Sequence, residues 1–202
     1  MAEKSGLFAI LRRPAVYDFV QWLFRAERNR AWFAGTYLRA REGERMLDVG
    51  CGTADILRYL PRVDYVGFEP NPDYVAAARA AHGAAGTFHA GFFDAAAAAA
   101  LAPVDLALVG AVLHHMDDAQ ATELFALLRR VVKPGGRVVT IDNVYAPGQN
   151  PVAKLLIGLD RGRHVRAPEA YAALAAPHFG SVTGEVVHQA WPPYTFWIMT
   201  AR

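Results

Sequence analysis

The stretch LDVGCGTAD, residues 47–55, joins a short apolar run to the start of a helical pattern. Its two glycines, Gly50 and Gly52, let the backbone turn sharply and come close to a ligand. In open α/β sheets, ligands bind at the carboxyl ends of the strands. The stretch therefore predicts an α/β fold with a ligand site directly after its first strand.

Short apolar runs alternate with helical patterns around this stretch. The predicted strands are residues 45–49, 65–68, 86–89, 104–109 and 137–141, and the predicted helices between them are residues 55–60, 75–81, 95–100 and 119–132. Such alternation predicts a parallel sheet that is covered by helices on both faces. The fourth and fifth runs are almost continuously apolar, as is typical of strands buried on both faces.

The two ends of the chain depart from this alternation. A helix predicted at residues 168–176 is followed by two strands, 182–187 and 196–200. We expect them to form an antiparallel pair at the edge of a doubly wound, mostly parallel seven-stranded sheet. Helical spacing of apolar residues between Pro14 and Arg41 predicts an N-terminal helical cap, residues 1–41, on a domain formed by residues 42–202.

The composition fits one globular domain. The chain has 202 residues, of which 53% are hydrophobic, and a net charge of +2. That charge is too small to predict a nucleic-acid partner without a concentrated basic face. Cys51 is the single cysteine, which excludes an internal disulfide and fits a reducing compartment. We expect a cytoplasmic protein without integral membrane association, either a monomer or a homodimer.

A carboxylate follows the second predicted strand, where Glu69 could accept two hydrogen bonds from a ribose diol. A dinucleotide site would have a third glycine at the position of Asp55. Asp48 and Asp55 flank the glycine loop and would repel a diphosphate. They favour a ligand that carries an ammonium group and no phosphate, and S-adenosylmethionine meets that description.

In these segments the chain resembles the class I S-adenosylmethionine-dependent methyltransferases. The similar segments are MLDVGCGTADI (46–56), YVGFEPNPDYVAAAR (65–79), VDLALVGAVLHHMDD (104–118) and LLRRVVKPGGRVVTIDNVY (127–145). The resemblance implies a Rossmann-like methyltransferase fold, S-adenosyl-L-methionine as the cofactor and S-adenosylhomocysteine as the product.

The resemblance also implies which residues bind the cofactor. By their place in the similar segments these are Asp48, Gly50, Cys51 and Gly52 at the methionine part, Glu69 at the ribose, Pro70, Gly91, Phe92 and Asp94 at the adenine, and Gly110 and Leu113 near the methyl group. The chain departs from the family pattern at Ala54, where a third glycine is usual. It departs again after the third strand, where either Asp94 contacts the adenine amino group or Phe92 packs on the ring.

Transfer to an oxygen or nitrogen acceptor also requires the loss of a proton, and a histidine can take it near neutral pH. We predict His114 and His164 as catalytic residues and His115 as a substrate contact. A structural imidazole bonded to the backbone is the alternative for the adjacent pair. The predicted acceptor is a small organic molecule, methylated on oxygen.

Asp142 and Asn143 resemble the pair that binds magnesium in catechol-type methyltransferases. The fourth predicted strand ends at Gly110 without the additional carboxylate that such a site needs. We therefore predict no metal, and we place Asn143 in the substrate pocket.

The stretch LDRGRHVRAPEAY, residues 159–171, concentrates arginines beyond the fifth strand. It should emerge at the cofactor edge, so Arg161, Arg163 and Arg166 are predicted to bind the substrate, as anchors for an anionic acceptor or for the cofactor carboxylate. Alternatively, Asp160 pairs with an arginine and fixes the loop. Tyr17 is predicted to contact the substrate from an aromatic lid, which suits a partly hydrophobic acceptor.

Two other functions are compatible with the same sequence. One is a non-catalytic module that binds a nucleoside or a partner protein. The other is an enzyme that uses S-adenosylmethionine for elimination or cyclisation.

Overall fold

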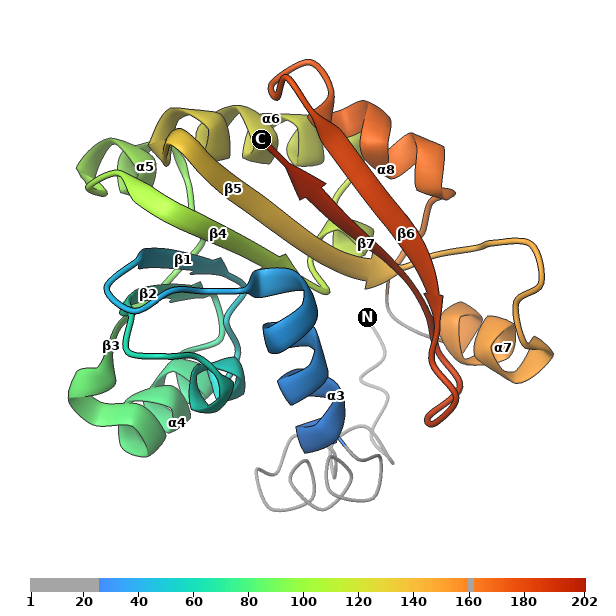
Figure 1. The fold of residues 1–202 in the computed structure, drawn as a ribbon, viewed down its shortest axis with the longest axis horizontal. Helices are drawn as coiled ribbons and strands as arrows, with labels where there is room; N and C mark the ends of the chain where they lie inside the picture. Colours follow the sequence, from blue (N-terminus) through green and yellow to red (C-terminus); the bar gives the residue numbers. More distant parts are fainter. Residues whose placement is uncertain (1–25, 160–161) are drawn as a thin grey trace, which may run out of the picture.

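The computed structural model describes residues 26–159 and 162–202. Its strands are β1 (Arg45–Val49), β2 (Asp64–Glu69), β3 (Gly86–Ala90), β4 (Val104–Gly110), β5 (Val132–Asn143), β6 (Val182–His188) and β7 (Thr195–Ala201). They form one sheet in the order β3-β2-β1-β4-β5-β7-β6 (Figure 1). The first five strands are parallel to one another, and β7 runs antiparallel between β5 and β6. The predicted fold class is confirmed.

Helices cover both faces of the sheet (Figure 1). One face carries α5 (Ala95–Ala100), α6 (Asp118–Val131) and α8 (Pro168–Ala175). The other carries α3 (Ala26–Phe33), the π-helical turn η1 (Ala34–Leu38), the 3₁₀ helix η2 (Asp55–Tyr59) and α4 (Pro72–His82). The remaining elements are α7 (Pro151–Leu159) and the 3₁₀ turns η3 (Gly83–Ala85) and η4 (Leu113–His115). No helix within the described ranges is long and apolar enough to cross a bilayer.

Alternation along the strands divides the hydrophobic core into two clusters. In β4, Ala107 and Val109 belong to the cluster under α6, whereas Leu106 and Leu108 belong to the cluster under α4. Successive side chains of a strand point to opposite faces, so a strand buried on both sides must be apolar at every position. This explains the continuous apolar runs in the sequence.

Two helices begin at strong capping signals. The Asp117 carboxylate accepts the N–H of Gln120 at 2.9 Å, and the Gln120 side chain accepts the N–H of Asp117 at 3.1 Å, which forms a capping box at the start of α6. Asn71 caps α4 and is followed by Pro72 at the first helical position. These caps fix the loops that leave β4 and β2 at the carboxyl edge of the sheet.

Some predicted boundaries were wrong. Residues 133–136, left between the predicted helix 119–132 and the predicted strand 137–141, lie inside β5, which accommodates them through a register shift opposite Val104–Leu106 and through the positive φ of Gly135. The predicted helix 14–41 ends at Leu38, because Arg39 adopts the left-handed conformation. Its residues 14–25 lie outside the described chain.

Arg137 on β5 holds the N-terminal segment against the sheet. Its guanidinium donates to the carbonyls of Leu38 and Arg39 at 2.8 and 3.0 Å and pairs with both carboxylate oxygens of Glu44 at 3.0 Å. Both charged side chains are only 13% exposed. The bidentate pair fixes the start of β1 relative to η1.

We predict that Arg137→Ala lowers the free energy of unfolding by about 3 kcal/mol, because it strands the buried Glu44 carboxylate and two carbonyls. Urea denaturation at pH 7 measures this change. Arg130→Ala, on the exposed side of α6, is the matched control and should change stability by less than about 0.5 kcal/mol. Equal stability of the two variants would contradict the role given to Arg137.

Candidate active site

A cleft of about 1430 Å³ opens at the carboxyl ends of the parallel strands. The predicted residues that line it are Asp48, Gly50, Cys51, Gly52, Glu69, Pro70, Gly91, Phe92, Asp94, Gly110, His114, His115 and Asn143. The topology therefore brings together residues from the ends of β1 to β5. Open α/β sheets bind their ligands at this carboxyl edge.

The glycine loop after β1 makes a sharp turn through positive φ angles. Gly50 has φ +74° and Gly52 has φ +55°. A Cβ at Gly50 would lie 2.5 Å from Cγ2 of Val112, so the loop after β4 packs on bare backbone there. Ala54 takes φ +56° and is buried, so the alanine occupies the third-glycine position in the same left-handed turn.

Cys51 fills the space beside β2. A Cβ at Gly67 would lie 2.7 Å from the Cys51 sulfur, so the glycine makes room for the side chain. Burial raises the pKa of the Cys51 thiol far above its usual value, and the nearby Asp48 and Glu69 carboxylates raise it further. A thiol in this environment stays protonated and is a poor nucleophile.

Backbone N–H groups fix Glu69 at the end of β2. Gly52 donates to Oε2 at 3.1 Å and Asn71 donates to Oε1 at 2.8 Å. The side chain is almost buried and lines the cleft. Each oxygen keeps further lone-pair capacity, which a ribose diol can use.

Asp48 at the end of β1 is buried and accepts the Tyr65 hydroxyl at 2.7 Å. Burial raises the pKa of Asp48 to about 7, against the lowering effect of the Tyr65 hydrogen bond, and the charge of Glu69 raises it further. The sequence predicts Asp48 as a cofactor-binding residue, but it predicts Tyr65 only as part of a strand.

The loop after β3 contributes both adenine candidates. Phe92 is 72% exposed and lines the cleft, whereas Phe93 is buried against Phe68, with ring centroids 5.3 Å apart. Asp94 lines the cleft too, although one of its oxygens accepts the N–H of Ala97 at 2.8 Å and caps α5. Phe92 and Asp94 both line the cleft, so which of the two contacts the adenine stays a prediction.

His114, which lines the cleft, forms a buried histidine–carboxylate pair with Asp142. The Nδ1 atom of His114 lies 2.8 Å from Oδ1 of Asp142, which also accepts the backbone N–H of His114 at 3.2 Å. Burial raises the pKa of Asp142, while the hydrogen bonds and charge of His114 oppose that rise. The His115 ring lies 4.1 Å from that of His114, so the adjacent histidines face the cleft together.

The segment around residue 164 packs directly against this pair. The backbone N–H of His164 donates to the carbonyl of His114 at 3.0 Å. A Cβ at Gly162 would clash with the His114 ring, so a bare backbone is needed there. The segment therefore supports η4 from outside the cleft. His164, predicted as a catalytic residue, is not among the described residues that line the cleft.

Arg166, predicted to bind the substrate, has a structural role instead. Its guanidinium donates to the carbonyls of Leu113, His164 and Met116 at 2.9, 2.9 and 2.7 Å and pairs with Asp118 at 2.7 Å. Every nitrogen of the group is engaged within the protein. The topological argument placed the segment at the correct edge, but it could not show that the side chain turns toward the loop after β4.

Other predicted residues also lie away from the described lining of the cleft. Leu113 is completely buried in the core, and Arg163 is exposed. Tyr17 and Arg161 lie outside the described residues.

Sequence reasoning missed several cleft residues that are remote along the chain. These are Arg30 and Phe33 of α3, Tyr74 of α4, Gln120 and Glu123 of α6, and Phe196 of β7. No local motif marks the residues of α3, α6 and β7, because only the fold brings them to the cleft, whereas Tyr74 lies within the similar segment 65–79. Tyr194 also lines the cleft and stacks on Phe196, with ring centroids 5.8 Å apart.

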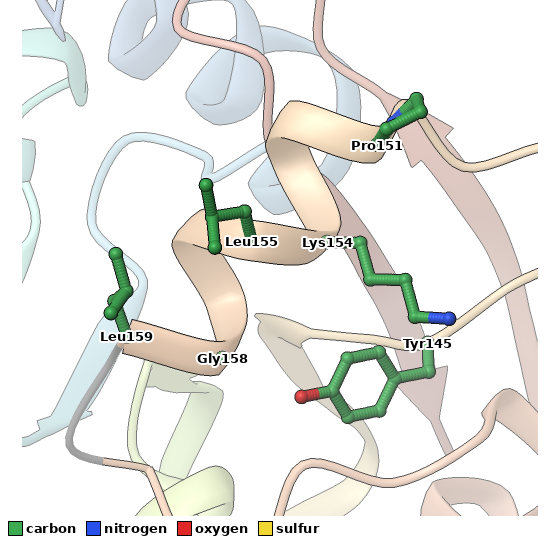
Figure 2. Close-up of a pocket in the computed structure, with 6 residues that line it drawn as sticks. All are labelled: Tyr145, Pro151, Lys154, Leu155, Gly158 and Leu159. Atoms are coloured by element: carbon green, nitrogen blue, oxygen red, sulfur yellow. The ribbon is translucent and has the colours of Figure 1, made fainter.

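A second, shallower cavity of about 540 Å³ lies at α7 (Figure 2). The Lys154 side chain extends toward the Tyr145 ring, while Leu155 and Leu159 project from other parts of the helix. Leu155 and Leu159 are exposed, and the described lining shares no residue with the main cleft.

The charges of the main cleft suit a ligand with a positive group. The buried acids Asp48 and Glu69 border the glycine loop, and Asp55 at its far side pairs with Arg30 at 3.2 Å. A diphosphate on this loop would face uncompensated carboxylates, whereas an amino acid ammonium would complement Asp48. The donors and acceptors therefore fit S-adenosylmethionine.

Comparison with known proteins agrees with this assignment. Residues 46–136 match the family model described as a methyltransferase domain. Acetylserotonin O-methyltransferase of Mus musculus is 34% identical over 149 residues, covering 64% of this chain and 37% of the mouse protein. The chain thus spans little more than a third of the curated relatives that it matches.

Solved structures share the fold at low identity. The pyocyanin biosynthetic protein PhzM has a TM-score of 0.72 at 17% identity, over 100% of this chain and 63% of that one. Human N-acetylserotonin methyltransferase in complex with S-adenosylmethionine has a TM-score of 0.66 at 19% identity, over 100% of this chain and 60% of that one. These likenesses concern the fold, which is the one predicted from the glycine loop.

We predict that Arg166→Ala lowers the free energy of unfolding by about 3 kcal/mol, because three carbonyls lose their donor. Thermal and urea unfolding measure the effect. Arg163→Ala, an exposed arginine of the same segment, should stay within about 0.5 kcal/mol of the unmodified protein. A folded Arg166→Ala variant of unchanged stability would refute the structural role.

Proposed function

We propose that this protein uses S-adenosylmethionine to methylate a hydroxyl oxygen of a small, partly hydrophobic acceptor. Two findings support this proposal: residues 46–136 match the methyltransferase-domain family model, and the fold is shared with S-adenosylmethionine-dependent methyltransferases. The observation that carries the oxygen assignment is the buried His114–Asp142 pair, whose histidine lines the cleft.

The nucleoside end of the cleft would hold the cofactor. Glu69 would accept the ribose hydroxyls, and Phe92 and Asp94 would flank the adenine. The glycine loop and Asp48 would receive the methionine part. When bound, S-adenosylmethionine supplies a methyl group already activated by its sulfonium.

The pair of His114 and Asp142 supplies the proton chemistry. With its proton on Nδ1 directed at Asp142, the imidazole carries its lone pair on Nε2. We assign the His114 imidazole as the group that takes the acceptor's hydroxyl proton. Asp142 then stabilises the imidazolium, and the backbone bond from His114 to the same oxygen fixes the ring's position.

A base is valuable for methylation on oxygen, because a phenol has a pKa of about 10 and an aliphatic alcohol is a still weaker acid. An amine that is already neutral needs no base. The aromatic wall of Tyr194 and Phe196, with Asn143 beside it, suits a hydroxylated aromatic acceptor. The similarity to a protein named acetylserotonin O-methyltransferase supports the same class.

An anionic acceptor is less well supported than the sequence suggested. Among the described arginines, Arg166 is fully hydrogen-bonded within the protein, and Arg30, which lines the cleft, pairs with Asp55. We therefore favour an uncharged acceptor. The proposal that residues 1–41 cap the cleft is supported by α3, which contributes Arg30 and Phe33 to its wall.

We predict that hydroxylated aromatic compounds release S-adenosylhomocysteine in an acceptor screen, and that His114→Ala lowers turnover about 10²- to 10⁴-fold. Asp142→Asn should lower turnover in the same direction, because the imidazolium loses its counter-charge.

His82→Ala, at the opposite end of α4 from the cleft, is the control and should keep normal turnover. Methylthioadenosine as the product would indicate elimination or cyclisation instead. Failure to bind either S-adenosylmethionine or S-adenosylhomocysteine would contradict the enzyme assignment.

A further inference from the structure

Asp48 owes its position to an arrangement on the neighbouring strand. In the parallel register of β1 and β2, Asp48 lies opposite Gly67, and Met46 lies opposite Tyr65. Because Gly67 has no side chain, the Tyr65 ring lies across its face, 3.1 Å from where a Cβ would stand. The Tyr65 hydroxyl thereby reaches Oδ2 of Asp48 at 2.7 Å.

The Tyr65 ring is held on all sides. It is almost completely buried, it packs 5.7 Å from the Phe88 ring, and a Cβ at Gly86 would lie 2.9 Å from it. Two glycines on adjacent strands thus leave the space in which the phenol lies. A ring fixed in this way gives its hydroxyl one direction, toward the carboxylate on the cleft wall.

We propose that Tyr65 is a positioning residue that holds the Asp48 carboxylate toward the cleft, and that the pair makes the site select ligands with an ammonium group. The inference rests on the cofactor assignment made above and adds the residue that determines this selectivity. Hydrogen bonding by Tyr65 to one carboxylate oxygen favours the charged form that an ammonium group requires.

The groups around Asp48 leave its negative charge without a neighbouring cation among the described residues, so the Asp48–Tyr65 pair would be stabilised by a ligand that carries one. Within the described residues, β2 presents Tyr65 and Glu69, the loop presents Cys51, and β4 presents the apolar Leu108 opposite Asp48. The cation Arg30 lines the same cleft but is paired with Asp55. Thus the nearest described partners are acids or neutral groups, and a ligand ammonium would be the complementary charge.

This arrangement sets the direction of a pH effect. Burial raises the pKa of Asp48 to about 7, so the carboxylate is mostly protonated at pH 6 and mostly ionised at pH 7.5. The ionised form binds the ammonium, so affinity should increase as pH rises through that range. Removing the Tyr65 hydroxyl removes a bond that lowers this pKa, so the increase should move to higher pH.

The test compares two probes by titration calorimetry between pH 6.0 and 7.5. S-adenosylhomocysteine carries the amino acid ammonium, whereas methylthioadenosine has the same nucleoside without it. We expect the affinity for S-adenosylhomocysteine to rise about fivefold to tenfold over this range, and that for methylthioadenosine to change less than about twofold. At pH 7, Tyr65→Phe should weaken S-adenosylhomocysteine about tenfold and spare methylthioadenosine.

Two variants serve as controls. Tyr37→Phe also removes a hydroxyl–carboxylate hydrogen bond, from Tyr37 to Glu185 at 3.0 Å, but away from the cleft wall, so it should leave both affinities unchanged. Asp48→Asn keeps the shape and removes the charge, so the preference for S-adenosylhomocysteine and its rise with pH should both disappear. Any pH dependence of the probe itself would persist in Asp48→Asn.

Other results would overturn the inference. Equal weakening of both probes by Tyr65→Phe would mean that the tyrosine only supports the fold. An S-adenosylhomocysteine affinity independent of pH in the unmodified protein would refute the selectivity of the pair. Failure of S-adenosylhomocysteine to bind at any pH, with methylthioadenosine bound or not, would refute the cofactor assignment as well.

Discussion

The left-handed turn after β1 is the constraint on which the cleft depends. Gly50 and Gly52 reverse the backbone so that their N–H groups point at β2 and at Glu69. Because Gly50 has no side chain, the loop after β4 approaches through Val112 and continues into His114. One turn therefore positions Glu69 and the loop that carries His114 on the same cleft.

Arg137 and Arg166 each connect segments that are distant in the sequence. Arg137 fastens the end of the N-terminal segment to β5, and Arg166 fastens the segment after α7 to the loop after β4. Both donate to several carbonyls of turns that no regular secondary structure satisfies, which is how buried irregular backbone remains stable. These hydrogen bonds hold the loop after β4 and the N-terminal segment against the sheet.

Local patterns made the fold and the cofactor end predictable. The glycine loop, Glu69 and the strand alternation each depend on residues close in sequence, so their geometry could be inferred from spacing. The pairings that complete the site are not local: Tyr65 lies 17 residues from Asp48, Asp142 lies 28 from His114, and Arg166 lies 53 from Leu113. The direction in which Arg161, Arg163 or Arg166 points depends on its rotamer and on packing, and the periodicity of the sequence does not predict either.

The two ends of the cleft use the same physical device. Asp48 and Asp142 are buried carboxylates at the ends of β1 and β5, and each is held by a ring, Tyr65 or His114. Burial alone disfavours the charge on both. Such a carboxylate is best stabilised when a cation comes beside it, which at Asp48 would be a ligand ammonium and at Asp142 the imidazolium formed by proton transfer. The cost of burying each negative charge would then be offset only while the site is occupied or reacting, which ties ligand charge and proton transfer to the same rigid sheet edge.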